Sequence, residues 1–458
     1  MSPGLDRVRQ AAEERKQEQF IALLHHVDDA LLGHAYRRLR REAAPGIDGV
    51  TWQAYGEDLD RNLTDLRDRI HRGAYRALPS RRQYIAKPDG RQRPLGIAAL
   101  EDKIVQRAVV EVLNAIYEAD FLGFSYGFRP RRGQHQALDA LAVAIDRTPV
   151  NWVLDADIAS FFDTVDHDRL IGCVERRVGD RRVIRLLRKW LKAGVMEDGR
   201  LMPTEVGTPQ GAVISPLLAN IYLHYVFDLW AQDWRQRHAR GSVVIVRYAD
   251  DIIVGFEHES DARRFLAELR QRLEEHALAL HPDKTRLIEF GRRAAASRAR
   301  QGLGKPESFN FLGFTHICGR ARSGAFQLVR KTRRDRLRAK LRELGTKLRS
   351  MMHVAIPEQG RWLGTVLRGY FAYHAVPTNQ RSLKAFRYHV SLLWRDALRR
   401  RSQRARVTYH DLTRLANQWL PHPRILHPWP SVRFAARHPR WEPGARIGHA
   451  GFCAGGAQ

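Results

Sequence analysis

The spacing of hydrophobic and polar positions changes along the chain and predicts a mixture of helices and strands. Segments typical of helices are residues 5–42, 101–117, 212–227 and 261–278. Segments typical of strands lie at 83–97, 151–158, on both sides of residues 248–251, at 285–291 and at 309–317. Because these elements do not follow a strict βαβ alternation, we expect an α+β fold with an antiparallel sheet.

From about residue 326 the pattern becomes helical and strongly basic. Within 330–350, leucines at positions 337, 341, 344 and 348 are spaced by four, three and four residues, which is typical of an amphipathic helix. Its other faces carry Arg and Lys. Basic residues continue to about residue 405 and are interleaved with aromatic residues, namely Trp362, Tyr370, Phe371, Tyr373, Phe386, Tyr388 and Trp394.

Length and charge narrow the class of protein. A chain of 458 residues is expected to form two or three domains, and an apolar fraction of 44% is enough for it to fold. Lys and Arg number 78 against 50 Asp and Glu, which gives a net charge of +28. We therefore expect a nucleic-acid partner, because each phosphate that the protein neutralises releases counterions. The alternative is a basic protein without such a partner.

Cysteine usage and hydropathy bear on the compartment. Cys173, Cys318 and Cys453 lie far apart without a CxxC pair, which excludes a disulfide framework or a four-cysteine zinc site and fits a reducing cytoplasm. The charged N-terminus lacks the apolar stretch of a secretory signal. Residues 212–227 are apolar but interrupted by polar residues and a proline, so they predict a buried helix. We expect a cytoplasmic protein with no membrane partner.

The first candidate for chemistry is the stretch VIVRYADDIIVGF, residues 244–256. Two apolar runs flank Tyr248, Ala249, Asp250 and Asp251, and we expect a hairpin with the two carboxylates in its tight turn. Like charges repel, and a desolvated carboxylate is unfavourable unless a cation lies against it. A divalent metal ion would satisfy the pair.

A third carboxylate is expected on a neighbouring strand. By strand alternation, Asp155 and Asp157 face the same side of the segment 152–158. The alternation does not choose between them, and a solvated edge of the sheet is the alternative explanation. Three carboxylates on one sheet are suited to two magnesium ions that serve a primer hydroxyl and a leaving pyrophosphate, which is nucleotidyl transfer.

The order of motifs is similar to that of the group II intron reverse transcriptases, also called maturases. The matching blocks are APGIDGVT, QYIAKPDGRQRPLGIAALEDKIVQRAV, FSYGFRPRRGQHQAL, LDADIASFFDTVDH, GTPQGAVISPLLANIYL, RYADD, LHPDKT and FNFLGF. The resemblance covers almost the whole chain and implies a right-hand polymerase, with fingers and an antiparallel palm followed by an α-helical thumb and maturase region.

This resemblance implies five segments. They are an N-terminal helical extension (1–42), the fingers with part of the palm (43–150), the palm with its catalytic hairpin (151–320), a helical thumb and maturase (X) region (326–425), and a basic Pro/Gly-rich tail (426–458). Many members of the family end in an HNH-type endonuclease with paired cysteines. We expect this chain to lack that domain and not to cut a second DNA strand itself.

The resemblance also assigns the catalytic residues. Asp157, Asp250 and Asp251 are implied as the ligands of two Mg²⁺ ions, with Mn²⁺ as a substitute and the backbone of Ile158 as a further ligand. Tyr248 and Ala249 would support the hairpin. Asp155 then becomes a neighbour of the site and not a ligand.

Substrate-binding roles follow in the same way, each with a structural alternative. Phe162 matches an aromatic gate against the ribose 2′-hydroxyl, although it would equally suit a core. Lys284 matches a possible general acid towards pyrophosphate, or is a solvated lysine. The remaining implied contacts are Gln210 and Gly211 near the templating base pair, and Lys87, Arg93, Arg81 and Arg82 near the triphosphate, where ordinary surface charge is the alternative for the last two.

The basic helix after residue 326 is implied to grip the template–primer duplex through phosphates, with Arg333, Arg334 and Arg338 as candidates. Residues 367–394 resemble the maturase region, which in this family binds the intron RNA. The aromatic residues there suit RNA, but a helical core explains them equally well.

The expected function is an RNA-directed DNA polymerase that uses its own group II intron RNA as template, a DNA primer or target, and dNTPs, with a maturase role in splicing and retromobility. Two alternatives are kept open. One is a domesticated reverse transcriptase of the defence, retron or diversity-generating kind. The other is an RNA-binding splicing factor with a vestigial polymerase site, against which the intact carboxylates Asp157, Asp250 and Asp251 argue.

Overall fold

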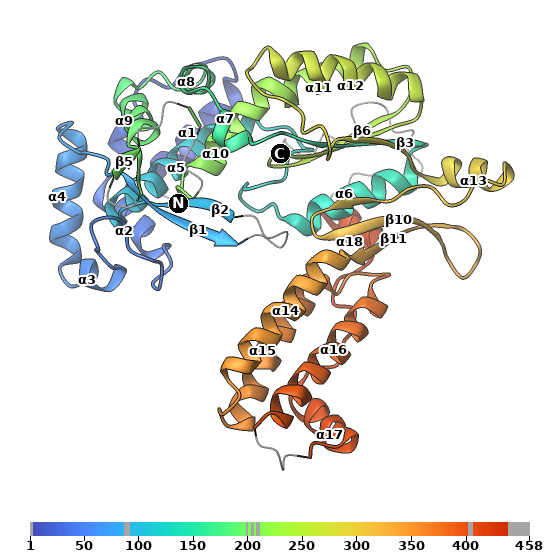
Figure 1. The fold of residues 1–458 in the computed structure, drawn as a ribbon. Coiled ribbons are helices and arrows are strands. Elements are labelled where there is room, and N and C mark those ends of the chain that lie inside the picture. Colours follow the sequence, from blue (N-terminus) through green and yellow to red (C-terminus); the bar gives the residue numbers. More distant parts are fainter. Residues whose placement is uncertain are drawn as a thin grey trace.

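The structure is a computed structural model, which describes residues 3–86, 92–197, 200–202, 206–207, 211–401 and 406–437. A body that contains three sheets carries a long helical arm, and Figure 1 shows the arm projecting away from the body. This arrangement of antiparallel strands and helices confirms the predicted α+β class with a helical region after the sheets.

The palm sheet lies at the centre of the body. Its strands follow the order β6-β7-β3-β8 and all neighbours are antiparallel. The strands are β6 (Val243–Tyr248), β7 (Asp251–Phe256), β3 (Trp152–Asp157) and β8 (Arg286–Glu289). These bounds agree with the strands expected at 151–158 and 285–291 and on both sides of residues 248–251.

Alternation along the palm strands supplies two cores, one on each face. Leu154 and Val254 belong to the larger core, with Phe265 of α12 (Glu259–Glu274). Val153 and Ile253 belong to a second core, with α6 (Gln134–Arg147). Because successive side chains point to opposite faces, a strand buried on both faces reads as a continuous apolar run, as residues 243–246 of β6 and 252–256 of β7 show.

A second sheet has the order β2-β1-β4-β5. Its strands are β1 (Ser80–Ala86), β2 (Gln92–Ile97), β4 (Val195–Glu197), which runs parallel to β1, and β5 (Arg200–Met202). Around it lie the long buried helix α5 (Leu100–Asp120) and the N-terminal helices α1 (Pro3–Glu14), α2 (Asp29–Arg37), α3 (Trp52–Gly56) and α4 (Leu59–His71). The expected strand pair around residues 87–91 is present, but the turn itself lies outside the described residues.

The N-terminal helical segment is interrupted, which differs from the continuous helical character expected for 5–42. After α1 ends at Glu14, the chain runs without an α-helix to α2. The buried guanidinium of Arg177 donates hydrogen bonds to the carbonyl oxygens of Arg15 at 2.7 Å and Glu18 at 3.1 Å. These carbonyls are therefore satisfied by a partner distant in sequence, which periodicity does not reveal.

A third sheet, in the order β11-β10-β9, joins the body to the arm. It comprises β9 (Phe309–Phe311), β10 (Phe314–Arg320) and β11 (Phe326–Thr332). The expected helix over 330–350 therefore starts later, because residues 330–332 pair with β10 as a strand. The helix, α14, runs from Arg334 to Ser350.

The arm consists of α14, α15 (Ile356–His374), α16 (Gln380–Arg399) and α17 (Tyr409–Trp419). Leu344 and Leu348 are buried in its core, and Leu337 and Leu341 pack against it, as their spacing predicted. Phe386 and Trp394 are fully buried, whereas Tyr388 is 49% exposed. The arm core therefore accounts for most of the aromatic residues, and Tyr388 remains available at the surface.

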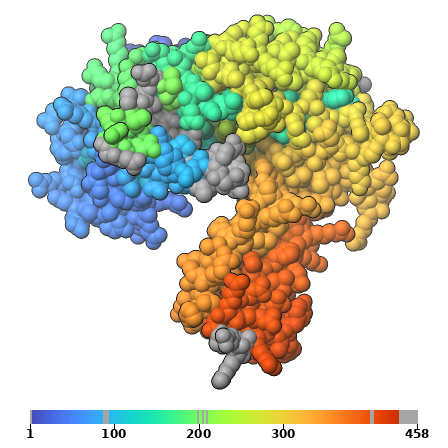
Figure 2. All heavy atoms as spheres, in the orientation of Figure 1, coloured from blue at the N-terminus to red at the C-terminus, as the bar shows by residue number. Residues whose placement is uncertain are grey.

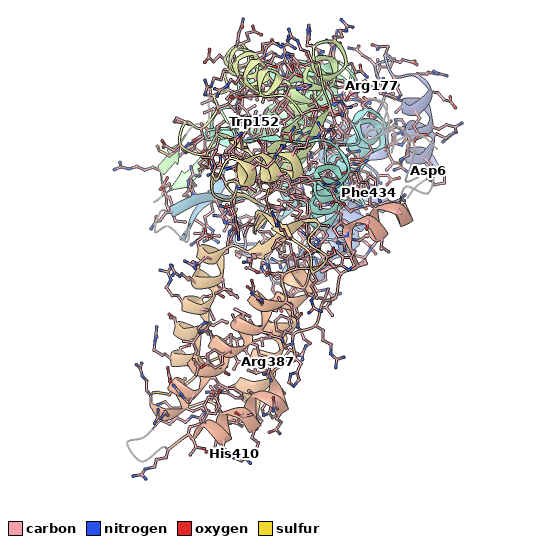
Figure 3. The ribbon with its side chains drawn as sticks, turned by 90° about the vertical axis from the view of Figure 1, so that its right-hand side faces the viewer. Asp6, Trp152, Arg177, Arg387, His410 and Phe434 are labelled. Carbon is pink, nitrogen blue, oxygen red and sulfur yellow. The ribbon has the colours of Figure 1, made fainter. Side chains whose placement is uncertain are left out.

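The chain returns from the arm to the body at α18 (Pro430–Arg437), a helix within the segment expected as a tail. In Figure 3, Arg387 and His410 lie on the arm, whereas Phe434 of α18 lies on the body. The buried carboxylate of Asp139 in α6 forms an ion pair with Arg330 of β11 at 3.3 Å and a second ion pair with Arg433 of α18. This ion cluster fixes the returning helix against the body.

The remaining elements are η1 (Leu24–His26), α7 (Phe161–Thr164), α8 (His167–Glu175), α9 (Arg181–Lys192), α10 (Ser215–Leu223), the π-helical turn η2 (His224–Asp228), α11 (Leu229–Arg237) and α13 (Arg292–Arg300). The apolar segment 212–227 forms α10 and η2 and is largely buried, as expected. In the part of the chain that the structure describes, every helix is too short or too polar to cross a membrane.

Candidate active site

The β6–β7 hairpin places only one of the two adjacent carboxylates in its turn, whereas both were expected there. Ala249 and Asp250 form the turn, and Asp251 already begins β7, paired with Tyr248. Ala249 has a φ of +56°, a left-handed conformation that a residue with a side chain adopts rarely. The turn is therefore a constrained feature of the backbone.

The third carboxylate lies directly across from Asp251. Asp157, the last residue of β3, is the cross-strand partner of Asp251 in the antiparallel register. Asp155 lies opposite Ile253 instead, two residues deeper along the strand. Like charges directly opposite one another on neighbouring strands are destabilising. The register thus brings Asp157, and not Asp155, to the hairpin carboxylates.

The carboxylates at this point are desolvated and repel one another. Asp251 reaches solvent at the sheet edge. Its carboxyl is nevertheless crowded by protein atoms, and this desolvation, followed by repulsion from Asp250, Asp157 and Asp155, raises the pKa of Asp251 to about 7. Desolvation also raises the pKa of Asp155 to about 6, against the opposing effect of Arg286, whose Nη2 lies 3.9 Å from it. A further cation would stabilise the ionised forms of Asp251 and Asp155.

Lys284 supplies one positive charge beside these carboxylates. The Nζ of Lys284 donates to Oδ2 of Asp157 at 2.7 Å. The segment that carries it is tied to the end of β3, because the His281 amide donates to the Asp157 carbonyl at 2.7 Å and the Ala159 amide donates to Ala279. The backbone of Ile158 lies between these two bonds. Lys284 therefore reaches the site from an anchored segment.

The donor set fits a hard divalent cation. Carboxylate oxygens are the ligands that Mg²⁺ and Mn²⁺ prefer. After desolvation, repulsion from Asp250, Asp157 and Asp155 contributes to the raised pKa of Asp251. Among the described residues, no three His, Cys, Asp or Glu side chains converge closely enough to hold an ion as they stand. Metal binding would therefore require the carboxylates of Asp157, Asp250 and Asp251 to close together.

Of the residues expected near the sugar of an incoming nucleotide and the templating base pair, the structure describes Phe162 and Gly211. Phe162, in α7, is partly buried against the larger core, with its ring 5.3 Å from that of Phe161. Gly211 has a φ of +112°, and a Cβ there would lie 2.7 Å from the Gly96 carbonyl oxygen of β2. Gly211 thus lies against the second sheet at a point that excludes a side chain. Gln210 lies outside the described residues.

The basic residues of β1 are engaged within the protein. Arg81 donates to the Pro45 carbonyl at 3.0 Å, and the Nε of Arg82 lies 3.6 Å from Glu197. Arg93 pairs through its backbone with Ile85, and its side chain lies outside the described residues, as does Lys87. Arg81 and Arg82 therefore have structural contacts, and their proposed contact with a triphosphate remains a prediction.

On the arm, the three arginines expected at a duplex differ in availability. Arg333 is paired with Asp335 at 2.6 Å, whereas Arg334 and Arg338 are exposed. Figure 2 shows an open concave space between the arm and the part of the body that contains the second sheet. The exposed cations of α14 would be available to a polyanion on this arm.

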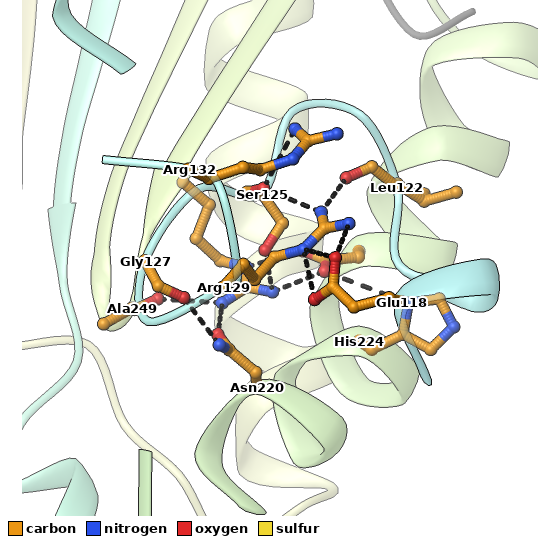
Figure 4. A network of polar contacts seen from close by, with 11 residues as sticks. Glu118, Leu122, Ser125, Gly127, Arg129, Arg132, Asn220, His224 and Ala249 are labelled. Carbon is orange, nitrogen blue, oxygen red and sulfur yellow. Dashed lines mark hydrogen bonds and ion pairs between the residues drawn. The ribbon is translucent and has the colours of Figure 1, made fainter. Parts of the chain in front are cut away.

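A fully buried arginine supports the turn and was not expected from the sequence. Arg247, the residue before Tyr248, is 0% exposed and donates to the Ala249 carbonyl at 3.1 Å. It also donates hydrogen bonds to Asp228, Asn220 and Ser125. Figure 4 shows Ala249, Asn220 and Ser125 within this network of polar contacts. A charged residue inside an otherwise apolar strand was the available signal, but its partners lie far away in the sequence.

Comparison with known proteins agrees with this geometry. The profile of the family described as reverse transcriptase (RNA-dependent DNA polymerase) matches residues 85–316, which contain the palm sheet and all three carboxylates. The chain belongs to the reverse transcriptase family. It is an RNA-directed DNA polymerase, and the predicted enzyme class is confirmed.

Several relatives of this reverse transcriptase carry names that refer to introns. It is 37% identical to protein YkfC of Escherichia coli over 62% of this chain and 79% of that protein. It is 36% identical to the group II intron-encoded protein LtrA of Lactococcus lactis over 48% of this chain and 37% of LtrA. A putative COX1/OXI3 intron 1 protein of Saccharomyces cerevisiae is 25% identical over 82% of this chain and 52% of that protein. The expected resemblance to group II intron reverse transcriptases is confirmed.

Proposed function

We propose that Asp157, Asp250 and Asp251 hold the two divalent ions of a nucleotidyl-transfer site. The observation that carries this proposal is the antiparallel pairing of Asp157 with Asp251, beside Asp250 in the turn. No structural role of the sheet requires three carboxylates at one point, since their mutual repulsion disfavours the fold. The ions are proposed to be Mg²⁺, with Mn²⁺ as a substitute, and the Ile158 backbone as an additional ligand.

The remaining residues would orient the substrates. When bound, the metal supplies the positive charge that favours the ionised primer 3′-hydroxyl and the leaving pyrophosphate. Lys284, already 2.7 Å from Asp157, is close enough to the carboxylates to donate a proton to that pyrophosphate. Phe162 would meet the sugar of the nucleotide with its partly exposed ring, and the loop at Gly211 would lie along the templating base pair.

The RNA partner of this reverse transcriptase is proposed to be a group II intron that the protein also helps to splice. Relatives named as intron-encoded or intron proteins support this, together with a net charge of +28. Arg334, Arg338 and Arg342 lie on the exposed side of α14, and Tyr388 and Lys384 are exposed on α16. Cations with an exposed aromatic ring suit structured RNA.

A splicing assay tests this part of the function. The precursor would be the intron RNA that surrounds the coding sequence, incubated at a Mg²⁺ concentration at which it does not splice alone. We expect wild type and an Asp250→Ala/Asp251→Ala variant to stimulate splicing equally, because the RNA-binding surface is separate from the carboxylates. An Arg334→Gln/Arg338→Gln/Arg342→Gln variant should bind the RNA more weakly and show a smaller salt dependence. The maturase proposal fails if wild type binds the precursor without accelerating splicing.

A further inference from the structure

The Arg247 side chain is the most completely satisfied polar group around the turn. Its Nε and Nη2 donate to the two oxygens of Asp228 at 2.7 and 2.5 Å. Its Nη1 donates to Asn220 Oδ1 at 3.0 Å and to the Ala249 carbonyl at 3.1 Å, and Nη2 also donates to Ser125 Oγ at 2.8 Å. An arginine has five N–H donors, and here each of them has an acceptor.

The acceptors come from separate elements that meet at this one guanidinium. Asp228 ends η2, Asn220 belongs to α10, and Ser125 lies in the loop between α5 and α6. Asp228 is 0% exposed, and its other neighbour is His224 at 4.0 Å. Burial lowers the pKa of His224 to about 4, so Arg247 is the counter-charge of Asp228 at neutral pH.

The same loop presses directly on the turn. Ser125 forms a parallel bridge with Arg247, and the Tyr126 amide donates to the Arg247 carbonyl at 2.8 Å. A Cβ at Gly127 would lie 2.3 Å from the Ala249 amide nitrogen, so this position tolerates no side chain. The side-chain Nδ2 of Asn220 donates to the Gly127 carbonyl at 2.6 Å. The loop and the turn are thus locked against each other.

Ala249 is the point at which this support is needed. Its left-handed φ of +56° is disfavoured for a residue with a Cβ and persists where the surroundings hold it. The Arg247 guanidinium holds its carbonyl from one side, and Gly127 confines its amide from the other. Asp250 and Asp251 follow directly, so their position depends on this one backbone conformation.

We propose that Arg247 is a positioning residue of this polymerase, which fixes the left-handed turn at Ala249 and thereby the direction of Asp250 and Asp251. The inference rests on the proposed role of these two carboxylates as metal ligands. It also couples the loop 122–133 to the catalytic hairpin, because Ser125 and Gly127 contact the same turn. Supporting groups of this kind are what hold a catalytic constellation within a fraction of an ångström.

The test compares Arg247→Lys with Arg330→Lys as a matched control. Arg330 is also a buried arginine, 2% exposed, paired with a buried aspartate, but it lies in β11 away from the turn. Both variants should have a lower melting temperature. We expect Arg247→Lys alone to lower kcat about 10- to 100-fold and to raise the Mg²⁺ concentration for half-maximal activity, since a small displacement of catalytic groups has effects of this size. The KM for dNTP should change little.

A second substitution separates positioning from general stability. Ala249→Gly adopts the left-handed conformation without the penalty of a Cβ. Combined with Arg247→Lys, it should recover part of the kcat that Arg247→Lys alone loses. If Arg247→Lys is too unstable to assay, Ser125→Ala, which removes one of the five hydrogen bonds, should show the same changes in kcat and Mg²⁺ requirement in milder form.

The outcomes distinguish this inference from the proposed function. If Arg247→Lys keeps the kcat and the Mg²⁺ requirement of Arg330→Lys, and Ala249→Gly restores nothing, Arg247 is purely structural and the inference is overturned. If Asp250→Ala/Asp251→Ala remains active in the same assay, the proposed metal site itself is wrong. Loss of activity in the double aspartate variant together with the shifted Mg²⁺ requirement of Arg247→Lys supports both.

Discussion

The two sides of the β6–β7 turn differ in how their charges are satisfied. Behind the turn, the buried Arg247 has an acceptor for every N–H donor and a carboxylate, Asp228, as counter-charge. In front, Asp250 and Asp251 lie with Asp157 opposite, and Oδ2 of Asp157 accepts a hydrogen bond from Lys284 at 2.7 Å. The back is complete without any ligand, whereas the front is suited to added positive charge. This contrast separates a scaffold from the site that we propose to bind metal ions.

The largest effect is expected at the front. Asp251→Asn should reduce primer extension by about 1000-fold or more, because it removes a proposed metal ligand where charge develops. Its melting temperature without divalent ions should rise, since repulsion from Asp250, Asp157 and Asp155 is removed. The control is Asp168→Asn, a carboxylate that is 91% exposed. Wild-type activity in Asp251→Asn would contradict the proposal that the carboxylates in front of the turn bind metal ions.

At the back, the expected effect is on stability. Asp228→Ala leaves the buried Arg247 guanidinium without its counter-charge and should lower the free energy of unfolding by about 3–5 kcal/mol. Urea unfolding measures this, and Asp168→Ala should change the value by no more than about 0.5 kcal/mol. A loss below about 1 kcal/mol would mean that the buried ion pair contributes little to the scaffold.

Lys284 sharpens the comparison, because it is a cation at the front. Lys284→Met should lower kcat about 100-fold if the lysine donates a proton to pyrophosphate. It should also lower the Mg²⁺ concentration for half-maximal activity, since the ion pair with Asp157 Oδ2 at 2.7 Å no longer competes with the metal. Titrating Mg²⁺ in steady-state primer extension gives both values. An unchanged kcat would mean that Lys284 does not act as the general acid and is a solvated lysine.

The smallest expected effect is a pH dependence of stability. The folded-state pKa of Asp251 is raised to about 7, above its ordinary value of 3.8, so its contribution to stability is greatest below about pH 4 and is lost as the pH rises through 7. In EDTA, the melting temperature of wild type should therefore fall relative to that of Asp251→Asn between pH 5 and 8. Asp102, whose pKa is raised to about 6 by burial, shifts in the same direction in both proteins, and its contribution cancels. If the difference in melting temperature between the two proteins stays constant from pH 5 to 8, the pKa of Asp251 is not raised.

Local patterns were sufficient for much of the fold. The strand at 152–157, the hairpin around residues 248–251 and the amphipathic helix of the arm all follow from side-chain spacing, because each has a face that must be buried. The boundary of that helix was wrong by four residues at its start, since residues 330–332 pair with β10. Alternative pairing with a neighbouring strand is not visible in a periodicity.

The arrangement of the site could not be predicted from side-chain spacing, because it depends on how neighbouring strands are paired. Asp155 and Asp157 share a face, so alternation alone left them equivalent, and the choice came from the family resemblance. The strand register supports that choice, because it places Asp157 opposite Asp251 and Asp155 opposite Ile253. Arg247 was missed for the same reason, because Asp228 and Ser125 are distant in the sequence and meet it only in the folded chain.

Primer extension is the measurement that tests the central claim most directly. Purified wild type and Asp250→Ala/Asp251→Ala would be given an RNA template with an annealed DNA primer, dNTPs and Mg²⁺, with Asp168→Asn as the control. We predict extension by wild type and the control and none by the double variant, whose melting temperature should be at least that of wild type. Extension by the double variant at a comparable rate would contradict the assignment of these carboxylates as the metal-binding site.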